Sequence, residues 1–259
     1  MRMMKKVLGT VTVLALSVSL LAGCGSTAVS PVSSTASTAA ESTTSSVVSE
    51  TTSAAADENA AAAAQLLNDL TGSYQELWPV ILADEYQQTW LDDCTALVGE
   101  ENAEAAFEKL SSMVTGDVYG EDAVEAYANG GGAYFCGFTN SLATLTFDGE
   151  TSTISGTDKD GNVLFSHTYH YIGMEPVHGL YEFESDDADS GEFTYFFLAP
   201  DTSAETYHIE FRYGSDAEAL SQYDAGEYAY WVASGISTDC DQTMIDNCIK
   251  LFCTENLAG

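Results

Sequence analysis

The chain has 259 residues, of which 45% are hydrophobic and 18% charged, enough to form a buried core, so a wholly disordered chain is excluded. Seven Lys and Arg against 40 Asp and Glu give a formal net charge of −33 at pH 7. Such an acidic chain repels phosphate backbones and anionic lipid headgroups, which excludes nucleic acid as a partner and favours cations or a basic protein surface.

The N-terminus has the features of a bacterial lipoprotein signal. Three basic residues within 1–6 precede a mostly apolar run over 7–21, which suits a secretion signal but is short for a transmembrane helix of roughly 20 residues. The run ends in Leu-Ala-Gly-Cys24, which resembles a lipobox in which Cys24 carries the lipid. We therefore expect residues 1–23 to be removed and acyl chains to hold the protein outside the cytoplasmic membrane.

Residues 24–56 have the composition of a flexible stalk. They consist almost entirely of Ser, Thr, Ala and Val and contain no aromatic residue. Such a segment cannot bury enough apolar surface to become ordered. We expect a disordered tether that carries a single folded domain, over 57–259, away from the membrane and through the wall of a Gram-positive envelope.

The folded part begins with helical patterns. An Ala- and Leu-rich run over 60–70 predicts a short helix. Apolar residues at roughly helical spacing predict a second helix over 74–91, in which Pro79 is tolerated only in the first turn or at a kink. Amphipathic patterns predict further helices over 101–113 and, at the C-terminus, over 238–256.

Between these helices the hydrophobic pattern changes to a period of two. Short runs rich in β-branched and aromatic residues, separated by turn residues, predict strands over 143–147, 151–155, 163–172, 179–184, 193–198 and 207–213. Six strands at hairpin spacing form an antiparallel meander. Because closure removes exposed edges, we predict a mainly β fold with flanking helices, built on a calycin- or lipocalin-like barrel.

No motif for enzymatic chemistry is present. The sequence has neither the G-x-S-x-G turn of a hydrolase nor a P-loop, so we predict that the protein is not an enzyme. The acidic run over 184–192 is expected to be solvated. His167 and His170 are expected at the surface or at the barrel rim, on opposite faces of their strand.

Beyond Cys24 the number of cysteines is odd, which in an exported protein leaves at least one thiol outside any disulfide. These residues are Cys94, Cys136, Cys240, Cys248 and Cys253. Up to two disulfides are compatible with this number, and buried structural thiols are the alternative. Cys248 and Cys253, five positions apart in one helix, are the least suitable pair.

The most informative short pattern is His208-Ile-Glu210. Alternation along a strand puts the two side chains on the same side, about 6.6–7 Å apart along the strand. An imidazole and a carboxylate suit Zn²⁺ if the lumen of the barrel supplies further ligands. A half-buried His–Glu ion pair is the alternative interpretation.

Several segments, in matching order over roughly 66–255, resemble the ZinT (YodA) family of exported zinc- and cadmium-binding proteins. The segments are 70–82, 169–173, 179–195 and 208–220. The resemblance implies a calycin-like barrel with flanking helices and a site for Zn²⁺ or Cd²⁺.

The resemblance also implies a reduced ligand set. The family holds its metal with two histidines of an H-F-H stretch and one histidine upstream. Here His208 takes the first position, Glu210 replaces the second, and Phe196 stands where the upstream histidine would be. Because zinc sites that are open to water use three protein ligands, His178 or a carboxylate near the barrel mouth is needed as the third.

Two functional hypotheses follow. The first is a lipid-anchored extracytoplasmic protein that binds Zn²⁺ or a similar divalent ion for metal scavenging or delivery, with a metal transporter as partner. The second is a calycin-like module that has lost the metal and binds a small ligand or a protein at a site lined by Phe196, Tyr207 and Tyr213.

Overall fold

The protein is described by a computed structural model over residues 58–200 and 208–258. The predicted signal peptide over 1–23, the lipid attachment at Cys24, the tether over 24–56 and the side chain of Tyr207 all lie outside the described residues. They stay predictions. None of the helices within the described residues combines the length and apolar character needed to cross a bilayer.

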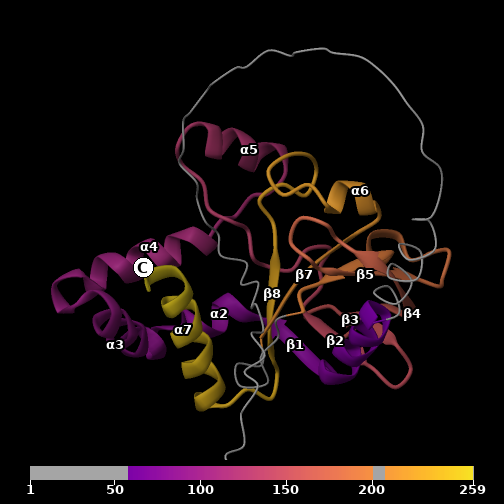
Figure 1. Cartoon of the computed structure of the whole chain (residues 1–259), viewed down its shortest axis with the longest axis horizontal. Helices are drawn as coiled ribbons and strands as arrows, with labels where there is room; N and C mark the ends of the chain where they lie inside the picture. The colour runs from indigo at the N-terminus through magenta and orange to yellow at the C-terminus, as the bar shows by residue number, and fades with distance from the viewer. Residues whose placement is uncertain (1–57, 201–207, 259) are drawn as a thin grey trace, which may run out of the picture.

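Eight strands form a closed antiparallel barrel (Figure 1). The strands follow one another around the barrel in chain order, and β8 pairs with β1 to close it. They are β1 (Gly72–Glu76), β2 (Thr144–Asp148), β3 (Thr153–Thr157), β4 (Val163–Met174), β5 (Tyr181–Ser185), β6 (Tyr195–Leu198), β7 (His208–Gly214) and β8 (Ala233–Ser237). The predicted mainly β fold, an antiparallel calycin-like barrel with flanking helices, is confirmed.

Two of the eight strands are missing from the sequence prediction. β1 occupies the start of the segment over 74–91, where a helix is predicted, so this part of the prediction is wrong. β8 has the sequence Ala-Ser-Gly-Ile-Ser, which lacks a run of β-branched or aromatic residues. Both strands are held by pairing with partners distant in sequence, which overrides a weak local preference.

The helices lie before, between and after the strands. Residues 58–69 are helical, and the labelled helices are α2 (Leu77–Ile81), α3 (Gln87–Val98), α4 (Ala103–Val114), α5 (Glu121–Ala128), α6 (Ala217–Leu220) and α7 (Gln242–Leu257). The predicted helices over 60–70, 101–113 and 238–256 therefore form. Pro79 lies in the first turn of α2, where its missing N–H would have no intrahelical acceptor.

Two hydrophobic cores meet at β8. The first fills the barrel and includes the buried aromatic side chains of Phe147, Phe183, Phe196, Phe211 and Tyr213. The second joins α2, α3, α4 and α7 to the outer face of the barrel, where Ile236 of β8 belongs to it. Figure 1 shows α3, α4 and α7 gathered on one side of the barrel. Both faces of the sheet are therefore buried on this side.

Candidate metal centre

The two predicted ligands on β7 point away from the barrel lumen. Ile209 and Phe211, which alternate with them, belong to the barrel core. His208 pairs across the sheet with Ile236, which belongs to the helical core. Cross-strand partners share a face, so His208 and Glu210 face α2 and α7. The expectation that they project into the lumen is wrong, because the apolar side chains that alternate with them along β7 fill the lumen.

A small cavity lies between β7, α2 and α7. Its volume is about 30 Å³, enough for an ion or one or two water molecules. The lining residues are Leu77, Trp78, Ile81, His208, Glu210, Cys248, Leu251, Phe252 and Glu255. Imidazole, carboxylate and thiol groups from two elements thus border one small, partly open cavity.

Glu210 also borders a second cavity, of about 40 Å³, on the side of β8. Trp78 and Phe252 line both cavities, while Cys136 and Ser234 line only the second one. Burial, and then the charge of Glu210, raise the pKa of the Cys136 thiol. The Glu210 carboxylate therefore lies between two small cavities within a mostly apolar layer.

Burial sets the protonation states in the first cavity. The His208 side chain belongs to a residue that is only 9% exposed, and its desolvation lowers its pKa to about 4. The imidazole is therefore neutral at physiological pH, which is the form that coordinates metals. Burial raises the pKa of the Cys248 thiol to about 12, so a metal ion would have to displace its proton.

The structure does not bring the third predicted ligand to this cavity. His178 packs its ring on Tyr223, with the ring centroids 3.7 Å apart, and its Nδ1 lies 3.5 Å from the buried Glu175 carboxylate. It is not among the lining residues. Phe196, at the position of the family's upstream histidine, is fully buried in the barrel core.

Cys248 and Glu255 are the residues that sequence reasoning missed. They lie seven positions apart on α7, which is two helical turns, and so share one face of that helix. That spacing was the available signal, but nothing in the sequence indicates that this face packs against β7. Within the part of the chain that the structure describes, no group of three or more His, Cys, Asp or Glu side chains is arranged to hold a metal ion. The donor types fit a zinc site, whereas their arrangement in this conformation is not a completed coordination shell.

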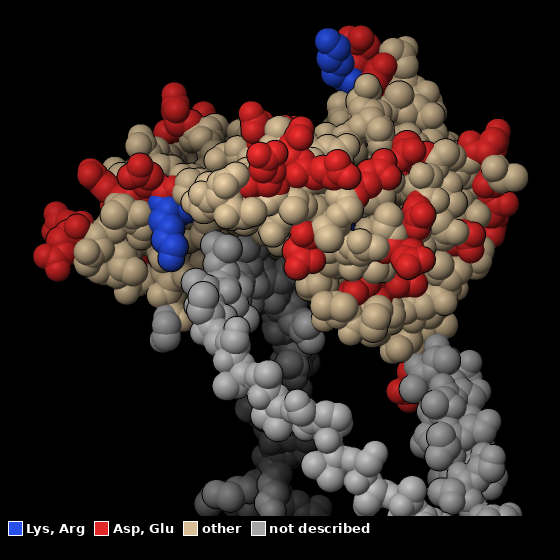
Figure 2. Space-filling model, turned by 90° about the horizontal axis from the view of Figure 1, so that it is seen from above, with Lys and Arg blue, Asp and Glu red and all other residues tan. Residues whose placement is uncertain are grey.

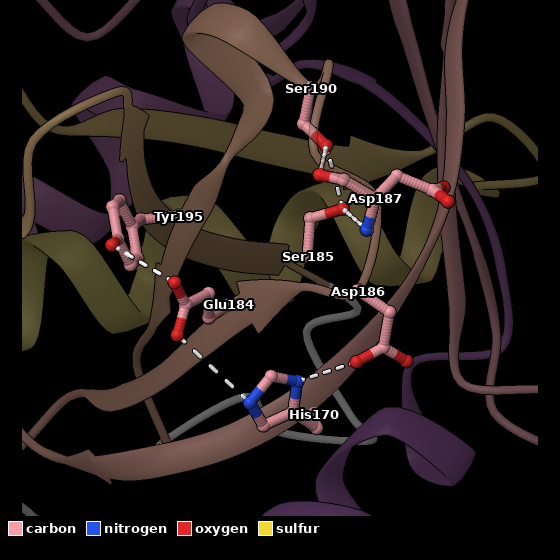
Figure 3. Close-up of polar contacts among 7 residues, drawn as sticks. All are labelled: His170, Glu184, Ser185, Asp186, Asp187, Ser190 and Tyr195. Carbon is pink, nitrogen blue, oxygen red and sulfur yellow. Dashed lines mark hydrogen bonds and ion pairs between the residues drawn. The ribbon is translucent and has the colours of Figure 1, made fainter.

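The other two histidines pair with the acidic segment instead. His170 Nδ1 lies 2.8 Å from Asp186 Oδ1, and its Nε2 lies 4.0 Å from Glu184 Oε2 (Figure 3). His167 Nδ1 lies 2.8 Å from Asp187 Oδ2. His170 is half-exposed on the outer face of β4, whereas the His167 ring stacks near Phe165 of the barrel core.

The acidic segment is also organised by its own hydroxyl groups. The Tyr195 hydroxyl donates to Glu184 Oε1 over 3.1 Å, and Ser190 Oγ donates to Ser185 Oγ over 2.7 Å (Figure 3). His167 and His170 thus engage three of the carboxylates in the run over 184–192.

Comparison with known proteins gives a fold-level likeness. Neither a protein-family profile nor a curated protein sequence matches this chain. The zinc-bound ZinT-like domain of AdcA from Streptococcus pneumoniae is 16% identical over 71% of this chain and 89% of that domain, with a TM-score of 0.45. Zinc-bound AdcA from the same organism is 14% identical over 72% of this chain, with a TM-score of 0.42, and the match covers 35% of its length.

Proposed function

We propose that the protein binds a divalent transition-metal ion, with zinc preferred, in the cavity between β7 and α7. The supporting observation is that His208 and Glu210 of β7 and Cys248 and Glu255 of α7 line one small, partly open cavity. Imidazole, thiolate and carboxylate are the side-chain ligands of zinc, and softer thiolate also suits cadmium. Such a protein serves metal scavenging or delivery rather than catalysis, with a metal transporter as its partner.

Metal binding requires a rearrangement of side chains that the cavity can accommodate. His208 is already in the neutral state that coordinates. Cys248 and Glu255 come from a helix whose side chains have rotamer freedom, so a shift of α7 residues toward β7 would complete a shell of three or four ligands. The net charge of −33 raises the local concentration of cations around the protein.

We further propose that the chain is a divergent, lipid-anchored relative of the ZinT-like domains. The support is the order of the similar sequence segments, the lipobox ending in Cys24 and the eight-stranded barrel with flanking helices. In this proposal the protein lies outside the cytoplasmic membrane, where it meets metal ions before a transporter does.

Calorimetric titration of the purified chain with Zn²⁺ tests the metal site. We expect one binding event, and we expect His208→Ala and Glu210→Gln each to weaken it by about tenfold to 100-fold or more, because each removes a ligand. His178→Ala is the matched control and should leave the affinity unchanged, since His178 does not line the cavity.

Substitution with Co²⁺ reports on the thiol. A thiolate-to-cobalt charge-transfer band that is lost in Cys248→Ser identifies Cys248 as a ligand. Absence of binding heat, or an affinity that does not respond to His208→Ala, would overturn the proposal.

No observation favours the alternative, a ligand pocket inside the barrel. Phe196 and Tyr213 are fully buried and stack with their ring centroids 5.4 Å apart. Phe193 stacks on Tyr213 in turn. Phe196 and Tyr213, the two described residues of the predicted lining, therefore fill this part of the barrel themselves.

A further inference from the structure

Two cysteines distant in sequence meet where α3 packs against α7. The Sγ atoms of Cys94 on α3 and Cys253 on α7 are 3.9 Å apart, although the residues are separated by 159 positions. Both residues are fully buried. They lie on a helix that precedes strands β2 to β8 and on α7, the last helix of the described chain (Figure 1).

The helical patterns explain why these two thiols face each other. Cys94 follows Trp90 by four positions, so both lie on the buried face of α3. On α7, Ile249 and Cys253 have the same spacing and the same burial. The two faces pack together, so the positions of the two thiols opposite each other are set by helix packing.

We propose that Cys94 and Cys253 form a disulfide bond that ties α3 to α7 when the chain folds outside the cytoplasm. The proposal rests on the extracytoplasmic location given above, but not on the metal site. It assigns a partner to two of the five cysteines and leaves Cys248 as a thiol at the cavity between β7 and α7. An odd number of cysteines agrees with this assignment.

The bond forms by exchange with a disulfide-bearing oxidant, either a thiol–disulfide oxidoreductase or a small disulfide such as oxidised glutathione. One thiolate of the pair attacks the disulfide of the oxidant, which breaks its S–S bond and releases one thiol. The second thiolate then attacks the mixed disulfide, forms the Cys94–Cys253 bond and releases the other thiol. Two protein thiols are oxidised, and one disulfide of the oxidant is reduced to two thiols.

Burial determines when this exchange takes place. In the packed protein both thiols are fully buried, so an oxidant cannot reach either sulfur atom. The exchange therefore occurs while α7 docks onto α3, before the interface excludes the oxidant. Once formed, the bond is protected from reductants by the same packing.

The bond also bears on the proposed metal cavity, because α7 forms one of its walls. A covalent link at Cys253 fixes the C-terminal turns of α7, where Glu255 lies, against α3. The link would limit how far α7 moves without preventing the rotamer changes of Cys248 and Glu255.

Peptide mapping of the full chain tests the pairing. The protein is refolded in a glutathione redox buffer, alkylated under denaturing conditions and cut with trypsin without reduction. The seven Lys and Arg place Cys253 alone in the fragment 251–259, Cys136 alone in 110–159, and Cys240 with Cys248 in 213–250. Cys94 shares its fragment with Cys24, and a second cut at glutamate residues separates them.

We expect a linked pair of peptides that contain Cys94 and Cys253, with the other cysteines alkylated. Complete alkylation of Cys253, or its linkage to any other cysteine, would overturn the proposal.

Thermal unfolding provides a second test. The oxidised chain should melt on the order of 10 °C above the reduced chain, because the link closes a long loop in the unfolded state. Cys94→Ser and Cys253→Ser should each abolish this response to reductant, while Cys240→Ser should retain it. Reduction is carried out on the unfolded chain, which is then refolded, because packing protects the bond in the folded protein. An unchanged midpoint after this treatment would contradict the proposal. Zinc titration of the same reduced samples reports separately on the metal site.

Discussion

His208 is a histidine on a strand that is buried on both faces. Its neighbours in sequence fill the barrel, while its own ring lies against α2 and α7 in a cavity that also holds Glu210, Cys248 and Glu255. Desolvation of the buried ring lowers the pKa of the imidazole from its usual value of 6.5 to about 4. The same burial that prepares the ring for a metal ion makes the folded state sensitive to acid.

The pH dependence of stability follows from this shift. Between pH 4 and pH 6.5 the unfolded chain binds a proton at His208 and the folded chain does not, so the contribution is complete above pH 6.5 and is lost as the pH falls toward 4. The contribution of His208 to the free energy of unfolding differs by about 3 kcal/mol between the two pH limits. Urea unfolding in the presence of a chelator, at pH 7 and at pH 4.5, should show a larger loss for the wild type than for His208→Gln.

The comparison with the variant is needed because carboxylates also titrate in this range. An equal loss of unfolding free energy in both proteins would show that His208 is not desolvated as described.

At the scale of elements, α7 forms one wall of the cavity and also packs against α3. It begins after Asp241, whose carboxylate accepts a hydrogen bond from the backbone N–H of Met244 over 3.0 Å. This contact satisfies one of the amide groups that the first turn leaves without a partner. The N-cap therefore helps to fix where α7 starts and which of its faces meets β7.

Removal of this cap has a predictable cost. We expect Asp241→Ala to lower the free energy of unfolding by about 1 kcal/mol, the usual value for an N-cap. Gln242→Ala is the matched control, because it removes only an exposed hydrogen bond to Asp246 and should cost a few tenths of a kcal/mol. Urea unfolding at pH 7 measures both. Equal effects of the two substitutions would contradict the assigned cap.

Some of these elements can be predicted from the sequence, and others cannot. Helices α4 and α7 and six of the strands are predictable because their periodicity is local. The direction in which His208 points is also indicated by β7 itself, because His208, Glu210 and Arg212 alternate with apolar residues that fill the barrel. What β7 alone does not indicate is that helices cover this polar face. Cys248 and Glu255 join the site through the docking of α7, a long-range contact that no short pattern encodes.

At the scale of the whole molecule, negative charge dominates the surface. Figure 2 shows carboxylates spread over both the barrel and the helices, with few basic side chains between them. Of the four basic residues within the described part of the chain, Arg212 is fully buried, which leaves Lys109, Lys159 and Lys250 at the surface. Arg212 is engaged by the backbone carbonyls of Leu220, Gln222 and Tyr228.

This imbalance should make the folded state more stable at high salt. A net charge of −33 repels itself more in the compact state than in the unfolded chain, and screening weakens that repulsion. We expect the midpoint of thermal unfolding to rise by several degrees between about 20 mM and about 0.5 M NaCl, because the Debye length falls from roughly 20 Å to roughly 4 Å. Choline chloride should give the same rise if screening, rather than binding of sodium, is the cause.

A variant with fewer negative charges tests whether charge repulsion lowers the stability of the folded state. Replacing Glu101, Glu104 and Glu108, which are exposed at and near the start of α4, by Gln removes three negative charges without touching either core. The variant should melt above the wild type at low salt and respond less to added salt, so that the two midpoints converge in about 0.5 M NaCl. A midpoint that falls with salt in the wild type would mean that surface ion pairs such as His170–Asp186 outweigh the repulsion. Stability would then depend on local pairing rather than on net charge.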